Sequence, residues 1–203
     1  MDYKNDDSFF LTVFAPFTFY GTAVKFWLLN SENGKYRFIR DWEIENEFWN
    51  AQQVSEMYPG TKLIGIAVNP WARIHYAYTQ LCLMKEQLSS PIDLSLLPLD
   101  TFDDFVKNIS NIPPQENFWF SFKTPMFRWF EYEENGETKT VEFLFKDETL
   151  EQDFKRIQDY FHSDVPLNLE QKLSNYQQYY TDETRKIIED IFKEDIDKFG
   201  YTF

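Results

Sequence analysis

The sequence predicts an α/β fold with a mainly parallel β-sheet flanked by helices. Two apolar runs, residues 9–14 and 63–68, have the unbroken hydrophobicity of strands that are buried on both faces. A helix is predicted from Trp71 to about Glu86, directly after Asn69–Pro70, because proline suits the first turn of a helix. Strands that alternate with helical segments in this way favour parallel pairing.

The segment between the two apolar runs is predicted to hold two helices and one strand. Thr22 is a suitable N-cap for the first helix, residues 36–39 indicate the strand, and Asp41 is a suitable N-cap for the second helix. Apolar residues recur along this second helix at three- and four-residue spacing, and Pro59–Gly60 ends it.

The second half of the chain predicts a hairpin and several helices. Residues 128–132 and 138–145 flank Asn135–Gly136, a strong signal for a β-hairpin turn. Residues 101–109 predict a short helix that has acidic residues in its first turn.

Two threonines are predicted to begin the last helices. Thr149 and Gln152 have the spacing of a capping box, and Thr181 is a suitable N-cap for the last helix. Neither a linker nor a repeat divides the chain, so residues 1–203 are expected to form a single domain.

Composition and charge restrict the function. The 20 basic and 34 acidic residues give a net charge of −14, which disfavours nucleic acid and anionic membranes as partners. Aromatic residues make up 20% of the chain, which is incompatible with an acidic disordered segment. One cysteine, Cys82, and two histidines leave no basis for a disulfide framework or a metal site.

The first residues do not resemble a secretory signal. They are acidic where a signal peptide carries positive charge, and the oily stretch 9–29 contains Pro16, Gly21 and Lys25. We therefore expect no signal peptide and no membrane span, and a location that is cytoplasmic or associated with a virus particle.

Three segments follow one another in a distinctive order. Asn69-Pro-Trp-Ala-Arg73 begins a helix after a buried strand, residues 141–154 join an apolar strand to the start of a helix, and residues 179–201 form a closing helix. In these segments the chain resembles the carbohydrate-type (family 2) sulfotransferase family. The resemblance implies a P-loop-like sulfotransferase fold, with a mainly parallel sheet, a β-hairpin and C-terminal helices. It also implies that 3′-phosphoadenosine 5′-phosphosulfate (PAPS) binds at the carboxyl edge of the sheet.

The resemblance, together with the chemistry of the residues, predicts which residues bind the PAPS donor and which acts as the catalytic base. Gly21–Thr22 at a helix start offers backbone N–H groups to an anion, and an ordinary turn and cap is the alternative. Arginine suits a phosphate because its fork matches the phosphate oxygens, and an ion pair with an acidic residue is the alternative for Arg73. The predicted site residues are the following: Thr18, Gly21, Thr22, Lys25 and Arg73 for the donor, and Asp41 or Glu43 as the base.

Several positions depart from the family pattern. The lysine of the first loop is replaced by Phe17, the arginine before Asn-Pro by Val68, and the serine after the arginine by Tyr76. Each charged contact to a phosphate stabilises binding by about 1.5–3 kcal/mol. Losing three such contacts would weaken donor binding by about 5 kcal/mol, or several thousandfold.

Three hypotheses about function follow. The leading one is a diverged sulfotransferase-like protein with weak or lost PAPS-dependent activity, which requires no cofactor and acts by binding a protein or a glycan. A bacteriophage structural or host-directed protein would be one such case. The second is an active sulfotransferase that acts on a carbohydrate or small-molecule hydroxyl and binds PAPS and its product PAP. The third is a glycan- or protein-binding module that uses aromatic loops. The sequence is compatible with an oligomer under each of them.

Other residues have simpler interpretations. His75 is expected to be a packed or surface histidine, and Cys82 a core residue. The Asp103–Asp104 and Asp182–Glu183 pairs resemble catalytic carboxylates but lie in helix first turns, where they favour capping. Aromatic residues in or near loops would form a binding patch if exposed, or fill a former nucleotide cleft if buried: Phe17, Phe19, Tyr20, Phe118, Trp119, Phe120, Phe122, Trp129 and Phe130.

Overall fold

The described part of the chain is a mixed α/β protein. A computed structural model describes residues 11–14, 50–57, 59–60, 62–86, 94, 97–112, 122–161, 166 and 175–203. Its backbone forms two compact units, one within residues 1–15, 19–67 and 128–170, the other within residues 16–18, 68–127 and 171–203. The single domain predicted over residues 1–203 stays a prediction.

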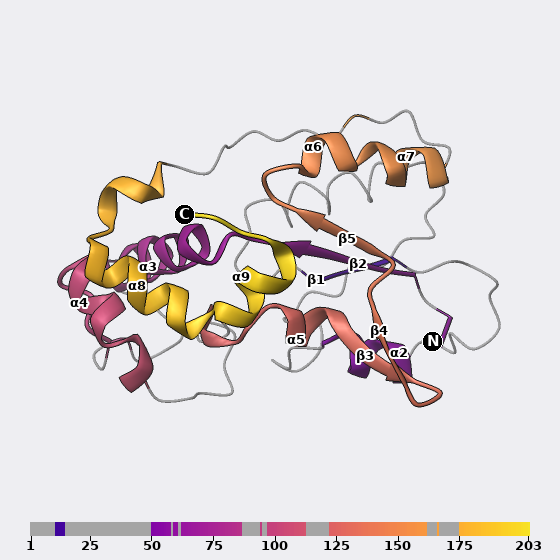
Figure 1. Ribbon diagram of the computed structural model, residues 1–203, viewed down its shortest axis with the longest axis horizontal. Coiled ribbons are helices and arrows are strands. Elements are labelled where there is room, and N and C mark those ends of the chain that lie inside the picture. Colours follow the sequence, from indigo (N-terminus) through magenta and orange to yellow (C-terminus); the bar gives the residue numbers. More distant parts are fainter. Residues whose placement is uncertain are drawn as a thin grey trace. The chain divides into compact units, whose positions relative to one another are not determined.

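The first unit contains a three-stranded parallel sheet. Strands β1 (Leu11–Phe14), β2 (Lys62–Ala67) and β5 (Phe143–Lys146) lie in the order β1-β2-β5, and both pairings are parallel (Figure 1). In β2 the residues from Leu63 to Ala67 are all buried, as the unbroken apolar run predicts for a strand covered on both faces. The predicted parallel pairing is therefore confirmed for β1 and β2, whereas β5 belongs to a segment that was predicted as a flank of the hairpin.

A glycine in β2 makes room for a large ring. A Cβ atom placed on Gly65 would lie 2.7 Å from Cδ1 and 2.9 Å from Cε1 of Phe130. The Phe130 side chain is fully buried, so the ring occupies the space that any other residue at position 65 would fill. The glycine thus serves close packing in the middle of the strand.

The hairpin turn is confirmed, but its flanks differ from the prediction. Strands β3 (Glu131–Glu134) and β4 (Glu137–Thr140) pair antiparallel around Asn135 (φ 56°) and Gly136 (φ 79°), the two positive φ angles of a type I′ turn. The start of the predicted first strand is instead helical, since α5 covers Phe127–Phe130. The predicted second strand is two strands, because β4 pairs in the hairpin and β5 in the parallel sheet.

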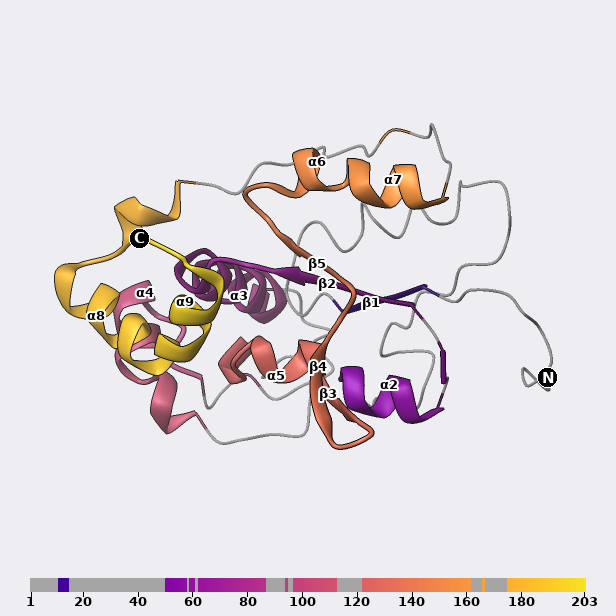
Figure 2. The ribbon, with the colours of Figure 1, turned by 45° about the vertical axis from the view of Figure 1, so that its right-hand side comes forward.

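Helix α2 (Ala51–Met57) lies beside β3 in the first unit, as both views show (Figures 1 and 2). The prediction of one helix running from Asp41 to Pro59–Gly60 is wrong at Asn50, which is not helical. The Asn50 side chain accepts the Gln53 N–H at 3.0 Å, and the Gln53 side chain accepts the Asn50 N–H at 2.9 Å. This reciprocal pair begins a new helix at Ala51.

Two short helices follow β5 in the same unit, α6 (Leu150–Asp153) and α7 (Lys155–Phe161). The predicted capping box at Thr149 is wrong, since its side chain caps no backbone N–H. The Thr149 hydroxyl donates instead to the Asp153 carboxylate at 2.6 Å.

The regular elements described in the second unit are helices and 3₁₀ turns. Its longest helix, α3 (Pro70–Glu86), confirms the predicted proline-initiated helix. The others are α4 (Phe102–Lys107), the 3₁₀ turns η2 (Ile109–Asn111) and η4 (Tyr176–Tyr179), α8 (Asp182–Ile191) and α9 (Lys193–Phe199). Helices α3, α4 and α8 contact one another. Their shared core contains the following fully buried side chains: Ile74, Ala77, Leu81, Phe105, Val106, Phe122 and Ile188.

The predicted last helix begins where expected and then breaks. The Thr181 side chain accepts the Thr184 N–H at 3.2 Å, and the Thr184 hydroxyl accepts the Thr181 N–H at 3.0 Å, so the predicted N-cap is confirmed. Phe192, which is buried, separates α8 from α9. The second helix ends at Gly200, whose left-handed conformation (φ 65°) is typical of a helix C-terminus.

Candidate functional site

Arg73 is the one predicted site residue that the structure describes. Thr18, Gly21, Thr22, Lys25, Asp41 and Glu43 lie outside the described residues. The aromatic residues Phe17, Phe19, Tyr20, Phe118, Trp119 and Phe120 lie outside them as well. The prediction that these groups form a donor site therefore stays a prediction. The surroundings of Arg73 are the part of the predicted site that the structure describes.

Arg73 lies inside the second unit. It is 1% exposed, and its Nη1 donates to the Thr124 carbonyl at 3.0 Å. Its Cζ atom lies 5.9 Å from the centre of the Phe192 ring, in reach of a cation–π contact. Burial lowers the pKa of Arg73 from 12.5 to about 10, while the Asp195 carboxylate acts in the opposite direction. The guanidinium is therefore charged at neutral pH and directed at groups of its own unit.

Asp195 on α9 is the acidic partner of this arrangement. Its side chain is fully buried and accepts the Met126 N–H at 2.7 Å and the Phe127 N–H at 3.0 Å. Burial raises the pKa of Asp195 above its usual range, whereas the two N–H groups and Arg73 lower it. The alternative interpretation of Arg73, an electrostatic pairing with an acidic residue, thus agrees with its surroundings.

The asparagine of the Asn-Pro motif also bonds within the second unit. The Asn69 Oδ1 atom accepts the Trp71 N–H at 3.1 Å, which caps the start of α3. Its Nδ2 atom donates to the Thr202 carbonyl at 3.0 Å. Both polar residues of this motif are therefore bonded to backbone groups nearby.

At the carboxyl edge of the parallel sheet, the described residues after β5 are charged. Asp147 is 5% exposed, and its N–H donates to the Ala67 carbonyl at 2.9 Å, which extends the β2–β5 ladder by one residue. Glu148 follows and is exposed. This edge is where parallel α/β sheets bind ligands, but here the charges that follow β5 are negative and would repel a phosphosulfate.

His75 is packed between rings. Its imidazole stacks on Tyr179, with ring centres 4.3 Å apart, and meets the Phe102 ring edge-on at 5.4 Å. Burial lowers the pKa of His75 from 6.5, so the neutral form is favoured. The half-buried, ring-packed histidine confirms the simpler interpretation of this residue.

Cys82 is half-buried, where a core position was expected. Its Sγ atom lies 3.9 Å from the Leu99 carbonyl oxygen. Burial raises the pKa of the Cys82 thiol, and it also raises the pKa of the neighbouring Tyr78 to about 12. A raised thiol pKa disfavours the thiolate that a nucleophile requires.

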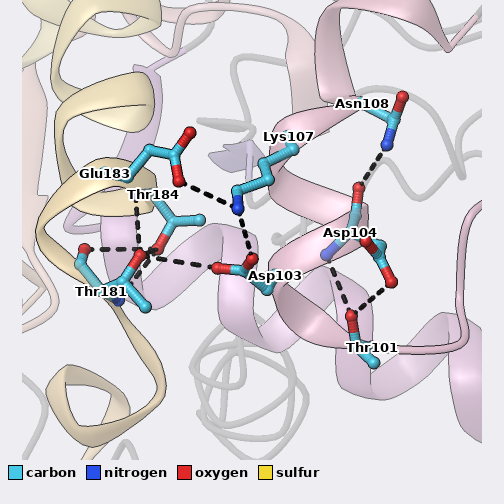
Figure 3. Close-up of polar contacts among 8 residues, drawn as sticks. All are labelled: Thr101, Asp103, Asp104, Lys107, Asn108, Thr181, Glu183 and Thr184. Atoms are coloured by element: carbon cyan, nitrogen blue, oxygen red, sulfur yellow. Dashed lines mark hydrogen bonds and ion pairs between the residues drawn. The ribbon is translucent and has the colours of Figure 1, made fainter.

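The acidic pairs contact a lysine and helix caps (Figure 3). The Lys107 Nζ atom lies 2.7 Å from the Asp103 carboxylate and 2.9 Å from the Glu183 carboxylate, which joins α4 to α8. Thr101 caps α4 by accepting the Asp104 N–H at 3.0 Å. The acids lie in the first turns of α4 and α8, as predicted, but the side chains that cap these helices are those of Thr101 and Thr181.

The described members of the predicted aromatic patch are not exposed. Phe122 and Phe130 are fully buried, and Trp129 is half-buried. Among the described residues, the exposed large apolar side chains are instead Leu83 and Tyr179. Sequence reasoning did not single out these two residues, because nothing in their local pattern distinguishes them from buried neighbours.

Within the described residues, no helix is long and apolar enough to cross a membrane. The same part of the chain contains no cluster of three or more histidine, cysteine or acidic side chains that could hold a metal ion. The sequence matches no model of a known protein family, and no curated protein matches it significantly.

Proposed function

We propose that this protein is a diverged sulfotransferase-like protein that has weak or lost PAPS-dependent activity and acts by binding a partner. The proposal starts from the order of segments that resemble the carbohydrate-type sulfotransferases. It is supported by the parallel pairing of β1, β2 and β5 and by the Asn69–Pro70 helix start that follows β2 in the chain.

The main support for a loss of donor binding is the environment of Arg73. A donor phosphate requires a guanidinium that it can reach, whereas Arg73 is 1% exposed and donates to the Thr124 carbonyl. Turning it outward would leave the Asp195 carboxylate buried without its neighbouring positive charge. Breaking a buried charge pair costs about 3–5 kcal/mol, which exceeds the gain of about 1.5–3 kcal/mol from one charged phosphate contact.

Thermal unfolding with and without PAP, the product of the donor, tests this proposal. A ligand at about 100 times its Kd stabilises a protein by about 2.7 kcal/mol, which raises the Tm of a chain of this size by several degrees. We expect no rise at millimolar PAP and low salt. A rise of several degrees would contradict the proposal and favour an active sulfotransferase.

If PAP does raise the Tm, two matched variants test whether it binds at the predicted donor site. Lys25→Ala removes the lysine that is predicted to replace the lost donor contact, and Lys155→Ala removes an exposed lysine of α7. If PAP binds at the predicted site, Lys25→Ala abolishes the Tm rise and Lys155→Ala preserves it. A rise that survives in both variants would place the nucleotide elsewhere.

A further inference from the structure

Phe203 lies in a cage of aromatic side chains within the second unit. Its ring meets Trp71 at 5.5 Å, Tyr180 at 5.6 Å and Tyr176 at 6.1 Å between ring centres, and all three contacts are edge-to-face. The Arg185 guanidinium carbon lies 4.6 Å from the centre of the same ring. Trp71, Tyr176, Tyr180 and Arg185 are called the Trp71 cage below.

The walls of the Trp71 cage are held together by bonds that do not involve Phe203. The Trp71 indole N–H donates to the Arg185 carbonyl at 3.0 Å, and the Tyr180 hydroxyl donates to the Trp71 carbonyl at 2.8 Å. Trp71 is 3% exposed, so its position is fixed by the core of the unit. The positions of Trp71, Tyr180 and the Arg185 backbone therefore do not depend on bonds to Phe203, which leaves this part of the cage preorganised for an aromatic ring.

The segment that carries Phe203 is bonded to the rest of its unit through two backbone groups. Tyr201 is buried and its N–H donates to the Ile196 carbonyl at 3.1 Å, whereas Thr202 is exposed and Phe203 is half-buried. The Asn69 side chain donates to the Thr202 carbonyl at 3.0 Å. The ring and the preceding carbonyl are groups that any extended peptide with an aromatic residue presents.

The contacts select an aromatic ring over an aliphatic side chain. The face of an aromatic ring is electron-rich, so it attracts a guanidinium, and ring pairs favour edge-to-face contacts. An aliphatic side chain could fill the same space but would gain neither effect. The chemistry that the cage recognises is therefore that of phenylalanine or a similar aromatic residue.

We propose that the Trp71 cage is a docking site for an aromatic side chain of a protein partner, and that Phe203 is its intramolecular occupant. This inference rests on the proposed function, in which the protein acts by binding, and it specifies the partner as a polypeptide with an aromatic anchor. The partner's aromatic residue replaces Phe203, and the carbonyl before it takes the place of the Thr202 carbonyl on Asn69.

Peptide binding to the full chain tests the proposal. The probe is the fluorescently labelled peptide Phe-Gly-Tyr-Thr-Phe, which copies residues 199–203 and has both ends blocked, and the matched peptide ends in alanine. In the wild type the tethered Phe203 competes at an effective concentration on the order of millimolar. We therefore expect Phe203→Ala to bind the first peptide at least tenfold more tightly than the wild type does, and not to bind the second.

Two further variants assign the binding to the cage. Arg185 is exposed, so Phe203→Ala/Arg185→Ala is expected to fold and to bind the peptide at least threefold more weakly than Phe203→Ala. Tyr179 is exposed and outside the cage, so adding Tyr179→Ala should leave binding unchanged. Equal affinity of the two peptides, or a folded Phe203→Ala that binds neither, would overturn the proposal.

Phe203→Leu covers the case in which the alanine variant does not fold. Leucine fills the cage but lacks the face that Arg185 and the ring edges contact, so it should be displaced more readily than phenylalanine. Tighter peptide binding by Phe203→Leu than by the wild type supports the proposal, and equal binding overturns it. PAP is absent from these experiments, so a failure here is distinct from a failure of the proposed loss of donor binding.

Discussion

The carboxylate of Asp195 on α9 accepts the backbone N–H of Met126, 69 residues earlier in the chain, at 2.7 Å. It accepts the next N–H, that of Phe127, at 3.0 Å, so one carboxylate caps the first turn of α5. Because the carboxylate also lies near the buried Arg73, it joins three segments of the second unit. This arrangement makes Asp195 a sensitive position for stability.

Asp195→Asn should lower the free energy of unfolding by about 3 kcal/mol. The amide keeps one acceptor oxygen, leaves one N–H of the α5 turn without its bond, and removes the negative charge beside Arg73. Urea unfolding followed by circular dichroism measures the change. The control is Asp197→Asn on the same helix, where an exposed carboxylate 3.2 Å from Lys193 should contribute less than about 1 kcal/mol. Equal losses in the two variants would contradict this role of Asp195.

The charge of Arg73 and that of Asp195 should be coupled. Arg73→Met leaves the carboxylate without a nearby cation, and Asp195→Asn leaves the guanidinium without a nearby anion. The double variant removes both charges, so it should lose less stability than the sum of the two single variants, by about 1–3 kcal/mol. The same urea measurement completes this cycle. Additive losses would show that the two groups act independently.

The pKa of His75 predicts a loss of stability in acid. Burial lowers this pKa below 6.5, so in mildly acidic solution the unfolded chain binds a proton that the folded protein resists. The free energy of unfolding should therefore fall as the pH drops below about 6.5. His75→Phe keeps a ring against Tyr179 and Phe102, and its stability should fall less between pH 7.5 and pH 5.5. Urea unfolding of both proteins at the two pH values measures this difference, and parallel losses would count against it.

The sequence correctly predicted the helices, strands and turns that are determined by residues within them or next to them. The unbroken apolar run predicted β2, Asn69–Pro70 predicted the start of α3, and Asn135–Gly136 predicted the hairpin turn. In each case the residues that determine the element are within it or next to it. The parallel pairing of β1 and β2 was also predicted, because strands that alternate with helical segments favour it, but the strand order was not.

The elements that were predicted wrongly depend on residues far away in the sequence or on polar contacts that the apolar spacing does not reveal. Helix α5 replaces part of a predicted strand because its first N–H groups bond to Asp195, which no local pattern indicates. The helix at Ala51 follows the reciprocal Asn50–Gln53 pair, which the prediction from Asp41 and the apolar spacing did not consider. The surroundings of Arg73 likewise depend on Thr124 and Asp195, which are distant in the sequence, so the motif alone left both a phosphate ligand and an internal pairing open.

The close approach of Gly65 to Phe130 gives a prediction for the first unit. Gly65→Ala places a Cβ atom 2.7 Å from the Phe130 ring and 3.1 Å from Leu144, so the buried ring must shift, and unfolding should become easier by about 1–3 kcal/mol. Phe130→Leu shortens the opposing side chain, so the double variant Gly65→Ala/Phe130→Leu should be more stable than the sum of the single losses implies. Gly136→Ala is the control for adding a methyl group to a glycine in open space, since only its positive φ of 79° opposes the change. Differential scanning calorimetry of the four variants measures these effects, and the absence of any recovery in the double variant would show that the ring does not set the requirement for glycine.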